Sequence, residues 1–69
     1  MVEVFKTNVQ KEKEAELLLE KLQEQFPQYK INFDLADCDK ILRVEGKQIQ
    51  PQNIISIMEK SSYNCEVLV

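Results

Sequence analysis

Two cysteines, Cys38 and Cys65, carry most of the chemistry open to this 69-residue sequence, because it contains no histidine. Without an imidazole, the Ser–His and Cys–His nucleophile pairs and every histidine-containing zinc site are excluded. Paired carboxylates could still act as acid and base, but a domain of this size offers little room for a cleft of the usual volume. We therefore expect a protein that is not an enzyme and that holds no cofactor.

Cys38 lies in a polar stretch together with Asp34, Asp37 and Asp39. Aspartate side chains hydrogen-bond to the nearby backbone in turns, so turn formation accounts for these carboxylates better than binding of a hard cation does. We expect Cys38 to be an exposed, reduced thiol in this turn. Cys65 has the inward phase of a strand and is expected to be a small hydrophobic residue of the core.

The composition is that of an ordinary globular domain, with 43% hydrophobic and 30% charged residues. We interpret residues 1–69 as one domain, close to the lower size limit for independent folding. Nine basic and twelve acidic residues give a net charge of −3, and no basic patch with interleaved aromatics indicates binding to nucleic acid. No window reaches the roughly 20 apolar residues of a membrane-spanning helix. Met1 to Val4 lack the basic start and apolar run of a signal peptide, so a cytoplasmic protein is expected.

The N-terminal part predicts a strand followed by a helix. Val2 and Val4 alternate with Glu3, which is typical of a strand whose valines face the core. Thr7 and Gln10 fit a capping box and predict that a helix begins there. Pro27 ends that helix, because proline disfavours the helical conformation of the residue before it. The apolar stripe recurs at steps of three and four residues, at Ala15, Leu18, Leu19, Leu22 and Phe26.

The remainder predicts three strands and a second helix. One face of the strand before the turn carries Ile31, Phe33 and Leu35, and residues 41–45 form the strand after it. Pro51 suits the first position of a helix, where its missing N–H does no harm. The apolar side of this helix consists of Ile54, Ile55, Ile57 and Met58. Residues 63–69 predict a last strand with Cys65, Val67 and Val69 on one face.

This order of elements predicts an α+β, ferredoxin-like βαββαβ sandwich, in which two helices cover one face of a four-stranded antiparallel sheet. The expected strand order is 4-1-3-2. It places the loop near Thr7, the turn at Cys38 and the loop before Cys65 at one end of the sheet. Strands three and four are then separated by roughly 10 Å, too far for a disulfide between the two cysteines.

The end of the chain resembles that of heavy-metal-associated domains, the family of the copper chaperones. Residues 58–67, Met-Glu-Lys-Ser-Ser-Tyr-Asn-Cys-Glu-Val, look like the family's second helix, its Gly-Tyr-like pair and its short last strand. Residues 44–47, Val-Glu-Gly-Lys, followed by Pro51, resemble its third strand and the start of its second helix. The resemblance covers the whole chain and implies the same fold.

The metal motif of that family is Met-x-Cys-x-x-Cys, whose two thiolates hold a soft ion such as Cu(I). Aligned on the apolar positions of the first helix, the motif's methionine falls on Val9 and its cysteines fall on Lys11 and Glu14. Neither side chain is a soft ligand, and no shift of the alignment supplies a cysteine. The resemblance therefore implies a vestigial metal loop that consists of Thr7, Asn8, Val9, Gln10, Lys11 and Glu14. Tyr63 is expected to lie near this loop.

The first predicted helix carries a glutamate at every fourth position, at Glu12, Glu16, Glu20 and Glu24. Like charges at that spacing cost an isolated helix about 0.2–0.5 kcal/mol per pair, and Lys13 and Lys21 offset part of this cost. Such a face either keeps a small protein soluble or docks a basic partner with a gain in association rate.

Two functions remain open. The first is a non-catalytic interaction domain that binds a protein or a small ligand through residues 7–11, the Cys38 turn or the glutamates of the helix. The second is handling of Cu(I) or Zn through a thiol site relocated to Cys38, with a second copy of the chain supplying another thiolate. A protein partner is expected in the first case, and a monomer is the default state.

Overall fold

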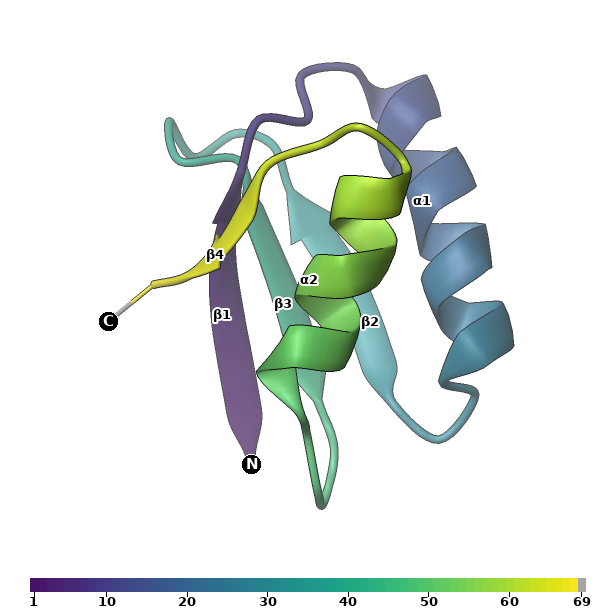
Figure 1. Cartoon of the computed structure of the whole chain (residues 1–69). Coiled ribbons are helices and arrows are strands. Elements are labelled where there is room, and N and C mark those ends of the chain that lie inside the picture. Colours follow the sequence, from purple (N-terminus) through teal and green to yellow (C-terminus); the bar gives the residue numbers. More distant parts are fainter. Residues whose placement is uncertain (69) are drawn as a thin grey trace.

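The computed structural model, which describes residues 1–68, has two helices on one face of a four-stranded antiparallel sheet (Figure 1). Its elements are β1 (Val2–Thr7), α1 (Glu12–Gln25), β2 (Lys30–Asp34), β3 (Ile41–Glu45), α2 (Pro51–Lys60) and β4 (Cys65–Val67). The predicted α+β class and βαββαβ order are confirmed.

The strands lie in the order β2-β3-β1-β4, as expected, so β2 and β4 form the two edges of the sheet. The antiparallel register places Phe5 opposite Leu42 and Ile31 opposite Val44. These four side chains share one face and form the core together with the helices. α1 lies against β2, and α2 lies against β4. Within residues 1–68, the other face of the sheet carries no helix (Figure 1).

The buried face of β1 is the opposite of the one predicted. Phe5 and Thr7 point into the core, whereas Val2 is 51% exposed and Val4 is half-buried on the open face. Burying an aromatic ring removes more apolar surface from water than burying a valine, so Phe5 decides the phase of the strand. The prediction that Val2 and Val4 face the core was wrong.

The first helix begins later than predicted. β1 runs on to Thr7, which pairs with Cys65 of β4, and α1 starts only at Glu12. Residues 11 and 14 make the capping contact instead, because the backbone N–H of Lys11 donates to the Glu14 carboxylate at 3.4 Å. The predicted capping box at Thr7 was therefore wrong, since the strand pairing and hydrogen bonds of Thr7 compete with that role.

Most other boundaries agree with the sequence. α1 ends at Gln25, and the backbone N–H of Phe26 still donates to the carbonyl oxygen of Leu22 at 2.8 Å before Pro27 follows. β3 coincides with the predicted strand, and Pro51 is the first residue of α2. Leu35 lies just beyond the end of β2 and is half-buried.

The last strand is shorter than predicted. β4 comprises three residues, and its first residue, Cys65, is buried as expected. Val67 has the same phase but is 38% exposed, because the strand lies at the edge of the sheet. Val69, which was assigned to the same face, lies outside the described residues.

Each helix buries one side against the sheet. α1 contributes Ala15, Leu18 and Leu22 to the core, and α2 contributes Ile54 and Met58, while Ile55 and Ile57 are half-buried. The apolar stripes predicted for both helices are thus confirmed. Within residues 1–68, neither helix is long and apolar enough to cross a membrane.

At the end of the sheet that holds the N-terminus, Tyr29 packs directly on Gly46. The Tyr29 hydroxyl donates to the carbonyl oxygen of Gln48, and its ring stacks on Phe26 with the ring centroids 5.3 Å apart. A Cβ atom on Gly46 would lie 2.5 Å from Cδ1 of Tyr29. Close approach of the ring, and not an unusual backbone conformation, explains the glycine.

We expect Gly46→Ala to lower the free energy of unfolding by about 1–3 kcal/mol, because the added methyl group overpacks against the Tyr29 ring. Urea unfolding followed by circular dichroism measures the change. Lys47→Ala, at the adjacent exposed position, is the matched control and should stay within about 0.5 kcal/mol of the parent. Equal midpoints for Gly46→Ala and the parent would contradict this account of the contact.

Candidate functional site

Three chain segments meet at the end of the sheet opposite the N-terminus: the β1–α1 loop, the β2–β3 turn and the α2–β4 loop (Figure 1). The backbone N–H of Thr7 donates to the carbonyl oxygen of Asp39 at 3.1 Å, which joins the first segment to the second. The backbone N–H of Asn64 donates to Oδ1 of Asn8 at 2.9 Å, which joins the first to the third. The predicted convergence of these loops is confirmed.

Thr7 is the central residue of this end and is only 7% exposed. Its hydroxyl donates to the carbonyl oxygen of Lys40 at 2.6 Å and accepts from the backbone N–H of Val9 at 3.2 Å. One side chain therefore connects the end of β1 both to the β2–β3 turn and to its own following loop. The threonine of the predicted vestigial loop has a structural role.

The rest of that loop is held by contacts within the chain. Val9, at the position of the family's methionine, is fully buried in the core, and Asn8 is engaged through its side chain. Gln10 and Lys11 are exposed. The two positions that align with the family's cysteines are occupied by the capping pair of α1, Lys11 and Glu14. This arrangement presents no soft ligand to a metal ion.

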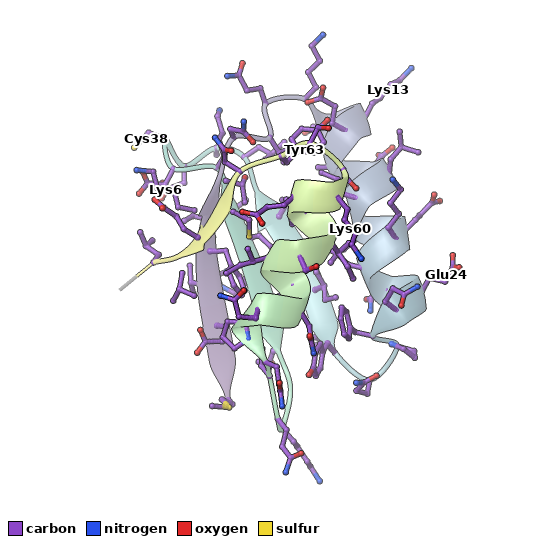
Figure 2. All side chains as sticks on the ribbon, viewed as in Figure 1. Lys6, Lys13, Glu24, Cys38, Lys60 and Tyr63 are labelled. Carbon is purple, nitrogen blue, oxygen red and sulfur yellow. The ribbon has the colours of Figure 1, made fainter. Side chains whose placement is uncertain are left out.

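Tyr63 lies beside the same loop, as predicted, and is half-buried (Figure 2). Partial burial and the nearby carboxylate of Glu14 raise the pKa of Tyr63 above its usual value. The phenol therefore stays protonated at neutral pH. Two of the predicted loop residues, Glu14 and Tyr63, are thus brought together by α1 and the α2–β4 loop.

Cys65 is a free but buried cysteine, with 6% of its surface exposed. Burial, reinforced by Glu59 and Glu66, raises the pKa of its thiol to about 12. A hollow of about 300 Å³ lies next to it, lined by Lys6, Thr7, Asn8, Glu59, Asn64 and Glu66. Because the thiolate is the nucleophilic and metal-binding form of cysteine, Cys65 is unsuited to either role at neutral pH.

Cys38 is a free, exposed cysteine at the outer tip of the β2–β3 turn (Figure 2). One ligand atom each from Asp37, Cys38 and Asp39 lies within 4.8 Å of the other two. Oδ1 of Asp37 also accepts from the backbone N–H of Asp39 at 2.9 Å, so the predicted polar turn is confirmed. Cys38 lies in the turn between β2 and β3, whereas Cys65 lies in β4. Because β1 lies between β3 and β4 in the sheet, the two cysteines are not on neighbouring strands.

The four glutamates of the predicted row, Glu12, Glu16, Glu20 and Glu24, are all exposed, whereas Glu14, also in α1, is half-buried. Steps of four residues advance about 40° around a helix, so the row winds around α1 instead of facing one direction. Glu12 and Glu16 border a groove against β2, whereas Glu24 lies near Lys21 and Lys60 on the side of α2. Figure 2 shows Lys13 and Glu24 near opposite ends of the helix. The sequence predicted the row but not its division between two surfaces.

The groove between α1 and β2 was missed in the sequence analysis. It has a volume of about 530 Å³ and includes the half-buried side chains of Leu19, Phe33 and Leu35. The available signal was indirect: the predicted strand order already made β2 an edge, and Leu35 continued its apolar phase past the strand. The size of this groove depends on the distance between α1 and the edge strand β2, and a pattern of residues in the sequence does not predict that distance.

Comparisons of this chain with protein-family models, with curated proteins and with solved structures found no match. The resemblance to heavy-metal-associated domains therefore stays a prediction from residues 44–51 and 58–67. The geometry of the two regions described here, the closed loop end and the open groove, is what supports a function.

We expect Thr7→Val to lower the free energy of unfolding by about 1–3 kcal/mol, because it leaves the Lys40 carbonyl and the Val9 N–H without their partner. Thermal or urea unfolding measures this loss. Thr7→Ser keeps the hydroxyl and is the matched control, so it should recover most of the difference. A Thr7→Val chain as stable as the parent would show that these hydrogen bonds do not hold the loop end together.

Proposed function

We propose that this chain is a non-catalytic interaction domain that docks a partner protein through the exposed side of α1. The observation that supports the proposal is the exposure of Glu12, Glu16, Glu20 and Glu24, with like charges four residues apart. These repulsions lower helix stability by about 0.2–0.5 kcal/mol per pair, and a basic partner would relieve them. The same charges would accelerate its association.

An apolar residue lies among these charges. Leu17 is 63% exposed and borders a hollow of about 220 Å³ together with Lys13, Glu16 and Glu20. An apolar side chain inside a polar rim is the arrangement that protein interfaces use at their centres. In this proposal the glutamates accelerate association, and Leu17 supplies an apolar contact in the bound complex.

The chemistry of the other candidate groups supports binding over catalysis. The raised pKa of Cys65 keeps its thiol protonated, and the same holds for the phenol of Tyr63. Lys11 and Glu14 are engaged in capping α1. The Cys65 thiol and the Tyr63 phenol are therefore not held as deprotonated nucleophiles at neutral pH.

Site-specific photocrosslinking tests the proposal. A photoreactive residue at position 17, on the exposed side of α1, should give a discrete adduct in cells that express the full chain. The yield should fall when Glu16 and Glu20 are both changed to glutamine, and it should fall with added salt because exposed charges are screened. Position 52, exposed on α2, is the matched control. The same adducts from both positions, or none from position 17, would contradict the proposal.

A second candidate function, handling of Cu(I) or Zn²⁺ at Cys38, is favoured by one observation. Ligand atoms of Asp37, Cys38 and Asp39 lie within 4.8 Å of one another on an exposed turn. A thiolate suits a soft ion, while the carboxylates are hard ligands better matched to Zn²⁺ than to Cu(I). A second copy of the chain would be needed to bring another thiolate to this turn.

Titration of the reduced chain with Zn²⁺ and with Cu(I) against a competing chelator separates this candidate from the first. If Cys38 is the ligand, native mass spectrometry should show a metal-bound species, predominantly a dimer, that is lost in Cys38→Ser. The Cys38→Ser chain should retain its crosslinks from position 17. Metal binding at full strength in Cys38→Ser would remove Cys38 from the account.

A further inference from the structure

We propose that the groove between α1 and the edge of β2 binds an extended, basic peptide segment, which pairs with β2 as an additional strand of the sheet. This inference goes beyond the proposed interaction function, because it concerns the groove against β2 and not the hollow beside Leu17. The free strand edge, the apolar lining and the charge of the groove each support it.

The first observation is the free edge of β2. Within the described residues, β2 pairs only with β3 and ends the sheet. An edge strand directs every second pair of backbone N–H and C=O groups outward, where another chain can bond to them. The opposite edge, β4, is only three residues long, whereas β2 has five residues and extends over about 17 Å. β2 is therefore the better template.

The second observation is the apolar lining. Leu19 of α1, Phe33 of β2 and Leu35 just after it are half-buried and pack against the core from the groove. Side chains of an added strand would alternate between the two faces of the sheet. Every second residue of the peptide would then enter the groove beneath α1 and cover this lining. Strand addition combines such side-chain contacts with backbone hydrogen bonds.

The third observation is the charge around the groove. Glu12 and Glu16 stand on the helix side and Asp34 on the strand side. Among the described residues, none that lines the groove is a lysine or arginine, although the Lys40 ammonium donates to the carbonyl oxygen of Leu35 at 3.2 Å. A peptide of net positive charge would be attracted to these carboxylates, and its lysines on the face away from α1 would lie on the same face as Asp34, whereas an acidic peptide would be repelled. The negative charge around the groove therefore favours a basic peptide over an acidic one.

A second copy of the chain fits this edge less well. Antiparallel pairing of β2 with itself about Asn32 would set Lys30 opposite Asp34 of the other copy, which is favourable. The two-fold axis would also bring the two α1 helices, each with five glutamates and two lysines, to the same side of the joined sheet, antiparallel to each other. The like charge of the two helices disfavours self-pairing and leaves the edge available for a foreign segment.

Binding of a synthetic peptide to the full chain tests the inference. The probe is a fluorescent nine-residue peptide of alternating valine and lysine, measured by anisotropy at low salt. Binding should be observed for this peptide and lost when glutamate replaces lysine. Methylating the backbone nitrogens of alternate residues removes the donors along one edge, so one of the two possible methylation patterns should weaken binding about tenfold.

Charge variants of α1 locate the site. E12Q/E16Q removes two carboxylates from the groove and should weaken the valine–lysine peptide about fivefold or more. E20Q/E24Q changes the net charge by the same amount on the same helix and should weaken it less than about twofold. Amide resonances of β2 should shift on peptide addition in the parent chain.

Four results would overturn the inference: no binding of the valine–lysine peptide, equal binding of both methylated peptides, equal losses in the two double variants, or a dimer in which β2 pairs with itself. If crosslinks from position 17 persist in any of these cases, only this inference fails and the interaction function stands. If those crosslinks are absent while the peptide still shifts the amide resonances of β2, the interaction function proposed for the Leu17 side of α1 fails and this inference stands.

Discussion

Thr7 stands where the end of β1, the β2–β3 turn and the loop before α1 meet, and its buried hydroxyl bonds to both neighbours. It donates to the Lys40 carbonyl at 2.6 Å and accepts from the Val9 N–H, while its own N–H bonds to Asp39. A buried carbonyl or amide without a partner is costly, so these contacts hold the three segments together. The length of β1, the late start of α1 and the burial of Val9 all depend on them.

The molecule is consequently asymmetric in what it offers to a ligand. At the Thr7 end, side chains and backbone groups are engaged with each other: Asn8 with Asn64, and Lys11 with Glu14. Along the edge of β2, no strand within residues 1–68 pairs with the outward side, and a groove lies beneath the acidic side of α1. The loop that the sequence predicted to be a vestigial metal loop is thus held by contacts within the chain, and the surface that binds is proposed to be the edge of β2.

The fold followed from the sequence because its strongest signals agree with each other. The apolar stripe of α1, Pro51 at the start of α2 and the alternation around Ile31 each pointed to one arrangement, and the strand order came with it. The errors lie where two local signals competed. At β1, the Val2–Val4 alternation lost to the larger Phe5, and a capping motif at Thr7 lost to pairing with Cys65 across 58 positions of sequence. The groove could not be predicted because it depends on the distance between α1 and β2.

Native-state hydrogen exchange of the full chain measures both halves of this account in one experiment. The account predicts slow exchange for the N–H groups of Thr7, Val9 and Asn64, which are hydrogen-bonded at the closed end, and fast exchange for every second amide of β2. Fast exchange at the first three would mean that the loop end is open to a ligand. Uniformly slow exchange along β2 would mean that its edge is already covered, and the central claim of a closed loop end and an open strand edge would be wrong.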